Sequence, residues 1–223
     1  MKTSVLPGGF TLTAHTGCEG TKDNSLEAIK KGYASGAEIV EFDLNFTPDG
    51  KAVLSHDEAD GKCVTLDDAF ALVTELPELR VNVDCKSVVN LKEVVGLAEK
   101  HGISGRFFYT GIFEKDVAAV REQTPQITYW LNFDVNRFKN SNEKYLLSLA
   151  QKVRELGAAG LNINHKKCSK KLVEVFHREG LLVSVWTVNE KRHMLRALKL
   201  GVDNITTREP FELKKVVELK TGA

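Results

Sequence analysis

Residues 39–43 read Ile-Val-Glu-Phe-Asp, a short apolar run that carries two carboxylates. Side chains alternate between the two faces of a β-strand, so Glu41 and Asp43 share one face while Val40 and Phe42 share the other. The run therefore predicts a buried strand that packs apolar side chains on one side and presents acidic groups on the other.

Short apolar runs of this kind recur along the chain and alternate with amphipathic stretches that are typical of helices. Such alternation favours a parallel sheet. Eight runs are predicted as strands, at 10–15, 38–44, 80–86, 106–109, 127–131, 160–163, 181–186 and 204–206. Four of the clearest helical patterns between them lie at 91–101, 143–156, 169–179 and 190–200.

Eight β/α units within 223 residues predict an α/β fold in which residues 1–223 form one domain, a (β/α)8 TIM barrel. The stretch after the second strand predicts a short insertion with a tight turn at Thr-Pro-Asp-Gly, residues 47–50. A doubly wound open sheet is the alternative, because periodicity does not show whether a sheet closes.

Helix boundaries are marked by polar residues at the starts and glycines at the ends. Asn24 with Glu27, Thr65 with Asp68, and Asn189 are predicted as N-terminal caps. Left-handed C-terminal caps are expected at Gly102, Gly157, Gly180 and Gly201.

The composition excludes several classes of protein. Lys and Arg number 31 and Asp and Glu number 30, so no global field attracts nucleic acid. No apolar run approaches the ~18 residues that a membrane span requires. These features predict a cytoplasmic location, no membrane span and a small-molecule partner, and they leave the oligomeric state open. The four cysteines form no CxxC pair and are expected to be free thiols.

Polar residues mark the ends of the first three predicted strands, where a barrel carries its functional groups. Residues 81–86 read Val-Asn-Val-Asp-Cys-Lys, which places Asp84 and Lys86 on one face. Clustered carboxylates repel one another unless a cation holds them, and oxygen ligands favour a hard divalent ion. Glu41, Asp43 and Asp84 therefore predict a site for one divalent cation, Mg²⁺ or Ca²⁺ foremost and Mn²⁺ as a third option. The alternative is a set of salt-bridged residues at strand ends.

Two histidines are placed to reach the same mouth of the barrel. His15 ends the first strand, and His56 follows the extension after the second strand. Imidazole titrates near neutrality, so one histidine can take a proton from an attacking hydroxyl while the other protonates a leaving alcohol. The remaining histidines have no such neighbours and are interpreted as structural or surface groups: His101, His165, His177 and His193.

An ordered set of motifs resembles the glycerophosphodiester phosphodiesterase family, and it covers nearly the whole chain. The motifs are His15 with Gly17, Asn24-Ser25, Gly-Ala-Glu-Ile-Val-Glu-Phe-Asp at 36–43, Thr-Pro-Asp-Gly at 47–50, His56-Asp57, Asn-Val-Asp-Cys-Lys at 82–86, Val-Trp-Thr-Val-Asn at 185–189 and Gly-Val-Asp-Asn-Ile at 201–205.

The resemblance implies a metal-dependent phosphodiesterase that hydrolyses glycerophosphodiesters to glycerol 3-phosphate and an alcohol, with a place in lipid and glycerol metabolism. It implies that Glu41, Asp43 and Asp84 bind the metal, that His15 and His56 are catalytic, and that Lys86 contacts phosphate. Trp186, at the end of the seventh predicted strand, is expected to contact substrate, whereas Tyr109 and Trp130 are more consistent with packing.

The chain departs from the family pattern in three places. Thr16 stands where the family usually has a phosphate-binding arginine, and Asp84 stands where it usually has glutamate. The segment 58–78 is shorter than the usual insertion, which predicts a more open mouth. Thr16 is expected to face the phosphate and to contact substrate. Lysines at 22, 166 and 167 are expected to compensate only in part for the missing arginine, because lysine lacks its bidentate fork. An alternative function follows from Thr16: an attenuated or non-catalytic barrel that binds a phosphorylated ligand.

Overall fold

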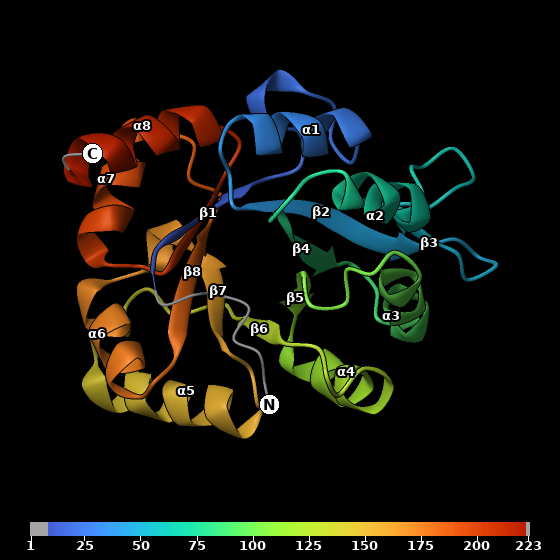
Figure 1. Ribbon diagram of the computed structural model, residues 1–223. Coiled ribbons are helices and arrows are strands. Elements are labelled where there is room, and N and C mark those ends of the chain that lie inside the picture. Colours follow the sequence, from blue (N-terminus) through green and yellow to red (C-terminus); the bar gives the residue numbers. More distant parts are fainter. Residues whose placement is uncertain (1–8, 222–223) are drawn as a thin grey trace.

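Eight parallel strands close into a barrel in the computed structural model, which describes residues 9–221 (Figure 1). The strands are β1 (Thr11–Ala14), β2 (Ile39–Phe46), β4 (Arg80–Cys85), β5 (Phe107–Ile112), β6 (Tyr129–Asn132), β7 (Gly160–Asn164), β8 (Leu182–Trp186) and β9 (Asn204–Thr207). Closure is direct, because Thr13 of β1 is in register with Ile39 of β2 on one side and with Thr206 of β9 on the other. The predicted (β/α)8 TIM barrel is confirmed and the open sheet is excluded.

The short insertion after the second strand is a hairpin. β3 (Ala52–Leu54) runs antiparallel to β2, and the amide of Gly50, at φ +86°, donates to the carbonyl of Thr47 at 2.8 Å. The amide of Ser55 then donates to the carbonyl of Asp43 at 3.0 Å. This contact holds the start of the loop that carries His56 beside the end of β2.

Helices surround the barrel and bury the outward faces of its strands (Figure 1). They are α1 (Leu26–Ala34), α2 (Leu66–Thr74), α3 (Leu91–Lys100), α4 (Val117–Gln123), α5 (Glu143–Glu155), α6 (Lys170–Arg178), α7 (Lys191–Leu200) and α8 (Pro210–Thr221), with three short 3₁₀ turns, η1 (Cys18–Gly20), η2 (Glu114–Asp116) and η3 (His165–Lys167). Phe42 of β2 packs near Phe70 of α2, with ring centroids 6.4 Å apart, as the alternation of residues 39–43 predicts. Within residues 9–221, no helix is both long and apolar enough to cross a bilayer.

One of the three predicted N-terminal caps is confirmed. Thr65 caps α2 by accepting from the amide of Asp68 at 3.0 Å. Ser25, not Asn24, caps α1, and Asn189 accepts from the amide of Arg208 instead of capping α7. Asn24 and Asn189 act across the fold because their side chains point away from the helix that follows each of them. The predicted positive φ is found at Gly102, Gly157, Gly180 and Gly201.

The barrel interior is filled by an apolar cluster, and polar side chains lie beyond it towards the C-terminal ends of the strands. Trp130 is fully buried and packs with Ile39 and Phe108 in a separate apolar cluster. Tyr109 is also fully buried, in the larger core. Both residues therefore serve packing, as expected, and the polar side chains that matter for function lie at the ends of the strands.

Candidate active site

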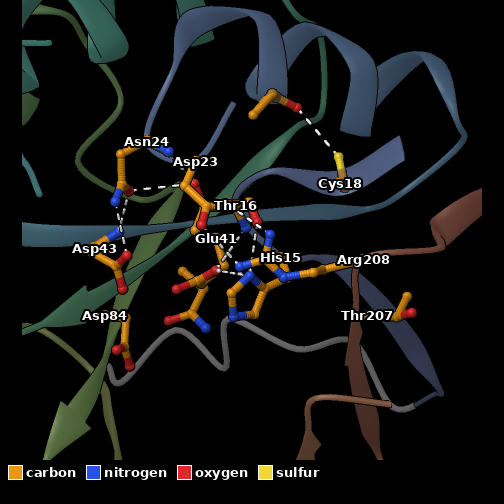
Figure 2. A network of polar contacts seen from close by, with 12 residues as sticks. His15, Thr16, Cys18, Asp23, Asn24, Glu41, Asp43, Asp84, Thr207 and Arg208 are labelled. Atoms are coloured by element: carbon orange, nitrogen blue, oxygen red, sulfur yellow. Dashed lines mark hydrogen bonds and ion pairs between the residues drawn. The ribbon is translucent and has the colours of Figure 1, made fainter. Parts of the chain in front are cut away.

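Three carboxylates meet at the C-terminal ends of β2 and β4. Asp43 and Asp84 are paired in register across these two strands, and Glu41 lies two residues before Asp43 on the same face. One oxygen from each of the three carboxylates lies within 4.8 Å of the others, and Glu41 and Asp43 are buried (Figure 2). The alternation of side chains along β2 and β4 predicted that the three carboxylates converge, and the structure confirms it.

The cluster has more negative than positive charge. Burial raises the pKa of Glu41 to about 7; His15 opposes this rise, and the neighbouring carboxylates of Asp43 and Asp84 add to it. The Nζ atom of Lys86 lies 2.9 Å from Asp43 Oδ1 and also pairs with Asp84. Burial opposes the charged form of Lys86, yet Asp84 and Asp43 outweigh it and raise the lysine pKa.

A divalent cation fits this donor set on chemical grounds. The three converging side chains offer only carboxylate oxygens, which are the ligands of hard cations such as Mg²⁺ and Ca²⁺. One ammonium group does not neutralise three carboxylates, so the cluster retains a net negative charge that a bound cation would relieve.

Asn24 holds Asp43 from two sides. Its Nδ2 donates to Asp43 Oδ2 at 2.9 Å, and its Oδ1 accepts from the backbone amide of Asp43 at 3.0 Å (Figure 2). The residue adopts a left-handed conformation, φ +55°, which turns the side chain back towards β2. The sequence did not reveal this role, because the two residues are 19 positions apart and Asn24 also resembles a helix cap.

Asp84 is positioned by the neighbouring strand. Thr110 Oγ1 of β5 lies 2.6 Å from Asp84 Oδ1, and Thr110 belongs to the stretch between Tyr109 and Ile112 where the register between β5 and β6 shifts. Gly111 follows at φ +72°, and a Cβ atom there would lie 2.5 Å from the carbonyl oxygen of Cys85. Only glycine allows β5 to approach β4 this closely.

His15 and His56 both line one cavity of about 560 Å³ with the carboxylate cluster. Nδ1 of His15 lies 2.8 Å from the carbonyl oxygen of Thr16, which can only accept, so Nδ1 carries the proton and Nε2 is the basic nitrogen of the neutral ring. His56 is more exposed, at 66% of its side chain, and its Nδ1 pairs with Asp57 Oδ1 at 2.8 Å.

The other four histidines do not line this cavity. His101 and His177 pair with Asp67 and Asp203, and the rings of His165 and His193 lie 4.9 Å apart. Their interpretation as structural or surface groups agrees with these contacts.

Thr16 differs from the expectation that it faces the phosphate. It is 3% exposed, does not line the cavity, and its Oγ1 accepts from the amide of Asn24 (Figure 2). Its own amide donates to Glu41 Oε2 at 2.9 Å. The physical reason is that the chain turns after the end of β1, so the side chain of Thr16 points into the protein and away from the cavity. There Thr16 contacts Asn24 and Glu41 beneath the site. The lysines at 22, 166 and 167 do not line the cavity either.

Arg208 enters the cavity from the end of β9 and was missed from the sequence. Its Nη1 and Nη2 lie 2.6 and 3.1 Å from the two carboxylate oxygens of Asp23. Lys115, from η2, also lines the cavity. The alternation of faces that identifies inward side chains stops at the last residue of a strand, so it does not predict the direction of Arg208. The sequence indicates only that a basic residue directly follows the eighth parallel strand.

Two buried polar atoms near the cavity have no protein partner within the described residues: the Oδ1 atom of Asn162 and the Nε1 atom of Trp186. Both residues line the cavity, from the adjacent strands β7 and β8. Buried polar atoms are rarely left unpaired, so an acceptor and a donor are available here to a polar ligand. Trp186, which is expected from the sequence to contact substrate, therefore has an unpaired donor at the wall of this cavity.

Comparison with known proteins agrees with this geometry. The model of the glycerophosphoryl diester phosphodiesterase family matches residues 13–102 and 69–211. A glycerophosphodiester phosphodiesterase of Caldanaerobacter subterraneus is 26% identical, over 97% of this chain and 98% of that protein. One from Bacillus altitudinis is 22% identical, over 93% of this chain and 98% of that protein.

Solved structures share the fold. A phosphodiesterase of Oleispira antarctica, determined in complex with the product sn-glycerol-3-phosphate, has a TM-score of 0.79 at 17% identity, covering 97% of this chain and 99% of that one. A protein of Silicibacter pomeroyi described as a putative glycerophosphoryl diester phosphodiesterase has a TM-score of 0.77 at 19% identity, covering 97% and 95%. The closed barrel, the carboxylate cluster at its mouth and the family match together establish that this chain belongs to the glycerophosphoryl diester phosphodiesterase family of hydrolases.

Proposed function

We propose that the protein hydrolyses glycerophosphodiesters to glycerol 3-phosphate and an alcohol in a reaction that requires one divalent cation. The observation that carries the proposal is the shared cavity: Glu41, Asp43 and Asp84, Lys86 and the two histidines line the same space at the mouth of a barrel of this family.

In this proposal the three carboxylates hold the cation, Mg²⁺ or Ca²⁺ foremost and Mn²⁺ as a third option. A bound divalent cation supplies positive charge that polarises the phosphoryl oxygens. Asn24 and Thr110 fix the carboxylates of Asp43 and Asp84, which limits the reorganisation needed on binding. Lys86, already beside two of these carboxylates, contacts a non-bridging phosphate oxygen as a point charge.

The histidines move the protons. Nε2 of His15 takes a proton from the water molecule whose oxygen forms the new bond to phosphorus, because the Thr16 carbonyl keeps the other nitrogen protonated. As the bond between phosphorus and the alcohol oxygen breaks, His56 delivers a proton to that oxygen. Asp57, bonded to Nδ1 of His56, orients the ring for this transfer.

The polyol part of the substrate suits the polar atoms opposite the carboxylates. A glycerol hydroxyl both donates and accepts, so it can satisfy the unpaired Asn162 Oδ1 and Trp186 Nε1. The complex of the Oleispira antarctica protein with sn-glycerol-3-phosphate supports this choice of product by analogy of fold.

Turnover of a panel of glycerophosphodiesters, with and without Mg²⁺, Ca²⁺ or Mn²⁺, tests the proposal. Release of glycerol 3-phosphate that depends on metal supports it. The alternative, a barrel that only binds a phosphorylated ligand, predicts tight binding of glycerol 3-phosphate without turnover of any member of the panel.

A further inference from the structure

Arg208 occupies a fixed position at the mouth of the barrel. Its amide donates to Asn189 Oδ1 at 2.9 Å, and its carbonyl accepts from the amide of Glu19 at 2.8 Å. Both backbone groups of the residue are therefore held, one by the loop after β8 and one by the loop after β1. The side chain starts from a defined point and extends towards His15 (Figure 2).

Asp23 orients the guanidinium group of Arg208. The two end nitrogens of Arg208 donate to the two oxygens of Asp23, at 2.6 and 3.1 Å. Guanidinium carries five N–H donors, so this bidentate pair uses two and leaves three. The side chain of Arg208 is 36% exposed and lines the cavity together with His15 and Glu41.

Gly17 leaves the room that this pair needs. A Cβ atom at Gly17 would lie 1.8 Å from Asp23 Oδ1 and 2.6 Å from Arg208 Nη1. The ion pair therefore passes directly over the backbone beside His15. Thr16, by contrast, points beneath the site and provides no positive charge.

We infer that Arg208, oriented by Asp23, forms an anion subsite that binds the phosphate of the substrate and supplies the guanidinium contact that position 16 lacks. The inference rests on the proposed function for the identity of the anion. Arginine suits the role because its planar fork matches two phosphate oxygens. The remaining cations of the cavity are lysines, and Lys86 is already paired with Asp43 and Asp84.

Four variants separate this role from a purely structural ion pair. Arg208→Gln removes the fork and the charge, Arg208→Lys keeps the charge alone, and Asp23→Asn removes the partner. Arg178→Gln is the matched control, because Arg178 is also a partly exposed arginine paired with a carboxylate, that of Glu143 at 2.8 Å, and it does not line the cavity.

The measurements are the Kd of inorganic phosphate and of glycerol 3-phosphate by calorimetry in saturating Mg²⁺, the Kd of Mg²⁺ itself, kcat and KM for a glycerophosphodiester, and Tm. We expect Arg208→Gln to weaken phosphate binding and lower kcat/KM by roughly tenfold to a hundredfold, the range for a charge-assisted hydrogen bond. Arg208→Lys should recover part of the loss, because lysine keeps the charge.

Asp23→Asn should change phosphate affinity at most about fivefold, the size expected for an exposed ion pair. Mg²⁺ affinity and the properties of Arg178→Gln should match those of the parent.

Phosphate affinity tests the role of Arg208, whereas turnover of glycerophosphodiesters tests the proposed function, so the two can fail separately. Unchanged phosphate affinity in Arg208→Gln, or equal losses in Arg208→Gln and Asp23→Asn, overturns the subsite, even where the parent enzyme turns over substrate. A parent protein that binds neither phosphate nor glycerol 3-phosphate overturns it as well. A loss specific to Arg208 in a protein that hydrolyses no glycerophosphodiester supports the subsite and overturns the proposed function.

Discussion

Asn24 and Asp43 are joined by two hydrogen bonds, one from the Asn24 amide group to the Asp43 carboxylate at 2.9 Å and one from the Asp43 backbone amide to Asn24 Oδ1 at 3.0 Å. Because Asn24 does not line the cavity, it acts by fixing the orientation of a carboxylate that does. The positive φ of Asn24 makes this arrangement dependent on the loop as well as on the side chain.

We expect Asn24→Gly to lower metal affinity by about tenfold to a hundredfold, as loss of a residue that orients a ligand usually does. Glycine accepts the positive φ without strain, so the effect isolates the side chain. Calorimetric titration of Mg²⁺ measures it. Ser25→Gly, which removes the helix cap and a hydrogen bond to the Lys22 carbonyl but no contact with Asp43, is the control. Wild-type metal affinity in Asn24→Gly would show that Asp43 needs no such partner.

His15→Ala and His56→Ala should each lower kcat by roughly a hundredfold or more, because each removes one proton-transfer group. Metal binding should persist in both, since neither histidine is among the three converging carboxylates. His177→Ala, which breaks a surface pair with Asp203, is the matched control. If His56→Ala alone retained full kcat, the acid would have to be sought elsewhere, whereas full kcat in both variants would refute the histidine mechanism.

Lys86→Met should destabilise the metal-free protein by about 1–3 kcal/mol, because Asp43 and Asp84 lose the hydrogen-bond donor and charge that they share. Saturating Mg²⁺ should restore most of this loss, so the rise in Tm on adding metal should be larger in the variant than in the parent. Calorimetric melting curves with EDTA or Mg²⁺ measure both values. Lys100→Met, which breaks an exposed pair with Asp67, should show no such difference. An equal rise in Tm in Lys86→Met and the parent would contradict a cation site at these carboxylates.

Trp186→Phe should raise KM for glycerophosphodiesters several-fold while leaving Tm nearly unchanged, because it removes the unpaired Nε1 donor and keeps an aromatic ring. Steady-state kinetics measure the change. The fully buried Trp130, mutated to Phe, should instead lower Tm with KM preserved in the folded protein. An unaltered KM in Trp186→Phe would exclude this atom from substrate recognition.

Only Cys63 should react quickly with a thiol reagent at pH 8. Burial raises the pKa of Cys18 to about 11 and that of Cys168 to about 12, and it raises the pKa of Cys85 well above its usual value. A thiol whose pKa lies far above the solution pH is almost entirely protonated, and these three thiols are also buried from the reagent, so they should react slowly. Ellman titration before and after unfolding should count one and then four thiols, in agreement with four free cysteines. The fast phase should vanish in Cys63→Ser; a second fast thiol in the folded protein would be inconsistent with this burial.

The sequence predicted the eight parallel strands because short apolar runs alternate along the chain with amphipathic helical patterns. It predicted the meeting of Asp43 and Asp84 because the period of two places each carboxylate on the inward face of its strand, and the two residues are in register. Strand ends were less accurate, as for β5, which runs three residues past its predicted end to Ile112, because a register shift and Gly111 extend it beyond the regular pattern.

The contacts made by loops were not predictable in the same way. Asn24 looks like a helix cap in the sequence, and only its backbone conformation directs it to Asp43. Arg208 directly follows β9, and Thr16 lies two residues past the end of β1. The alternation of faces stops there, so the direction of each side chain depends on tertiary contacts.

The seam between β1 and β9 joins the first and last strands of the barrel. The Asn204 side chain donates hydrogen bonds to Thr11 and Thr13. In the loop after β1, the amide of Glu19 donates to the carbonyl of Arg208. On the ribosome, the carboxylates of Glu41, Asp43 and Asp84 emerge long before β9 is made. All three acidic residues therefore leave the ribosome before the strand that completes the barrel, and the cavity that brings Arg208 to His15 forms only after residues 204–208 have left the exit tunnel.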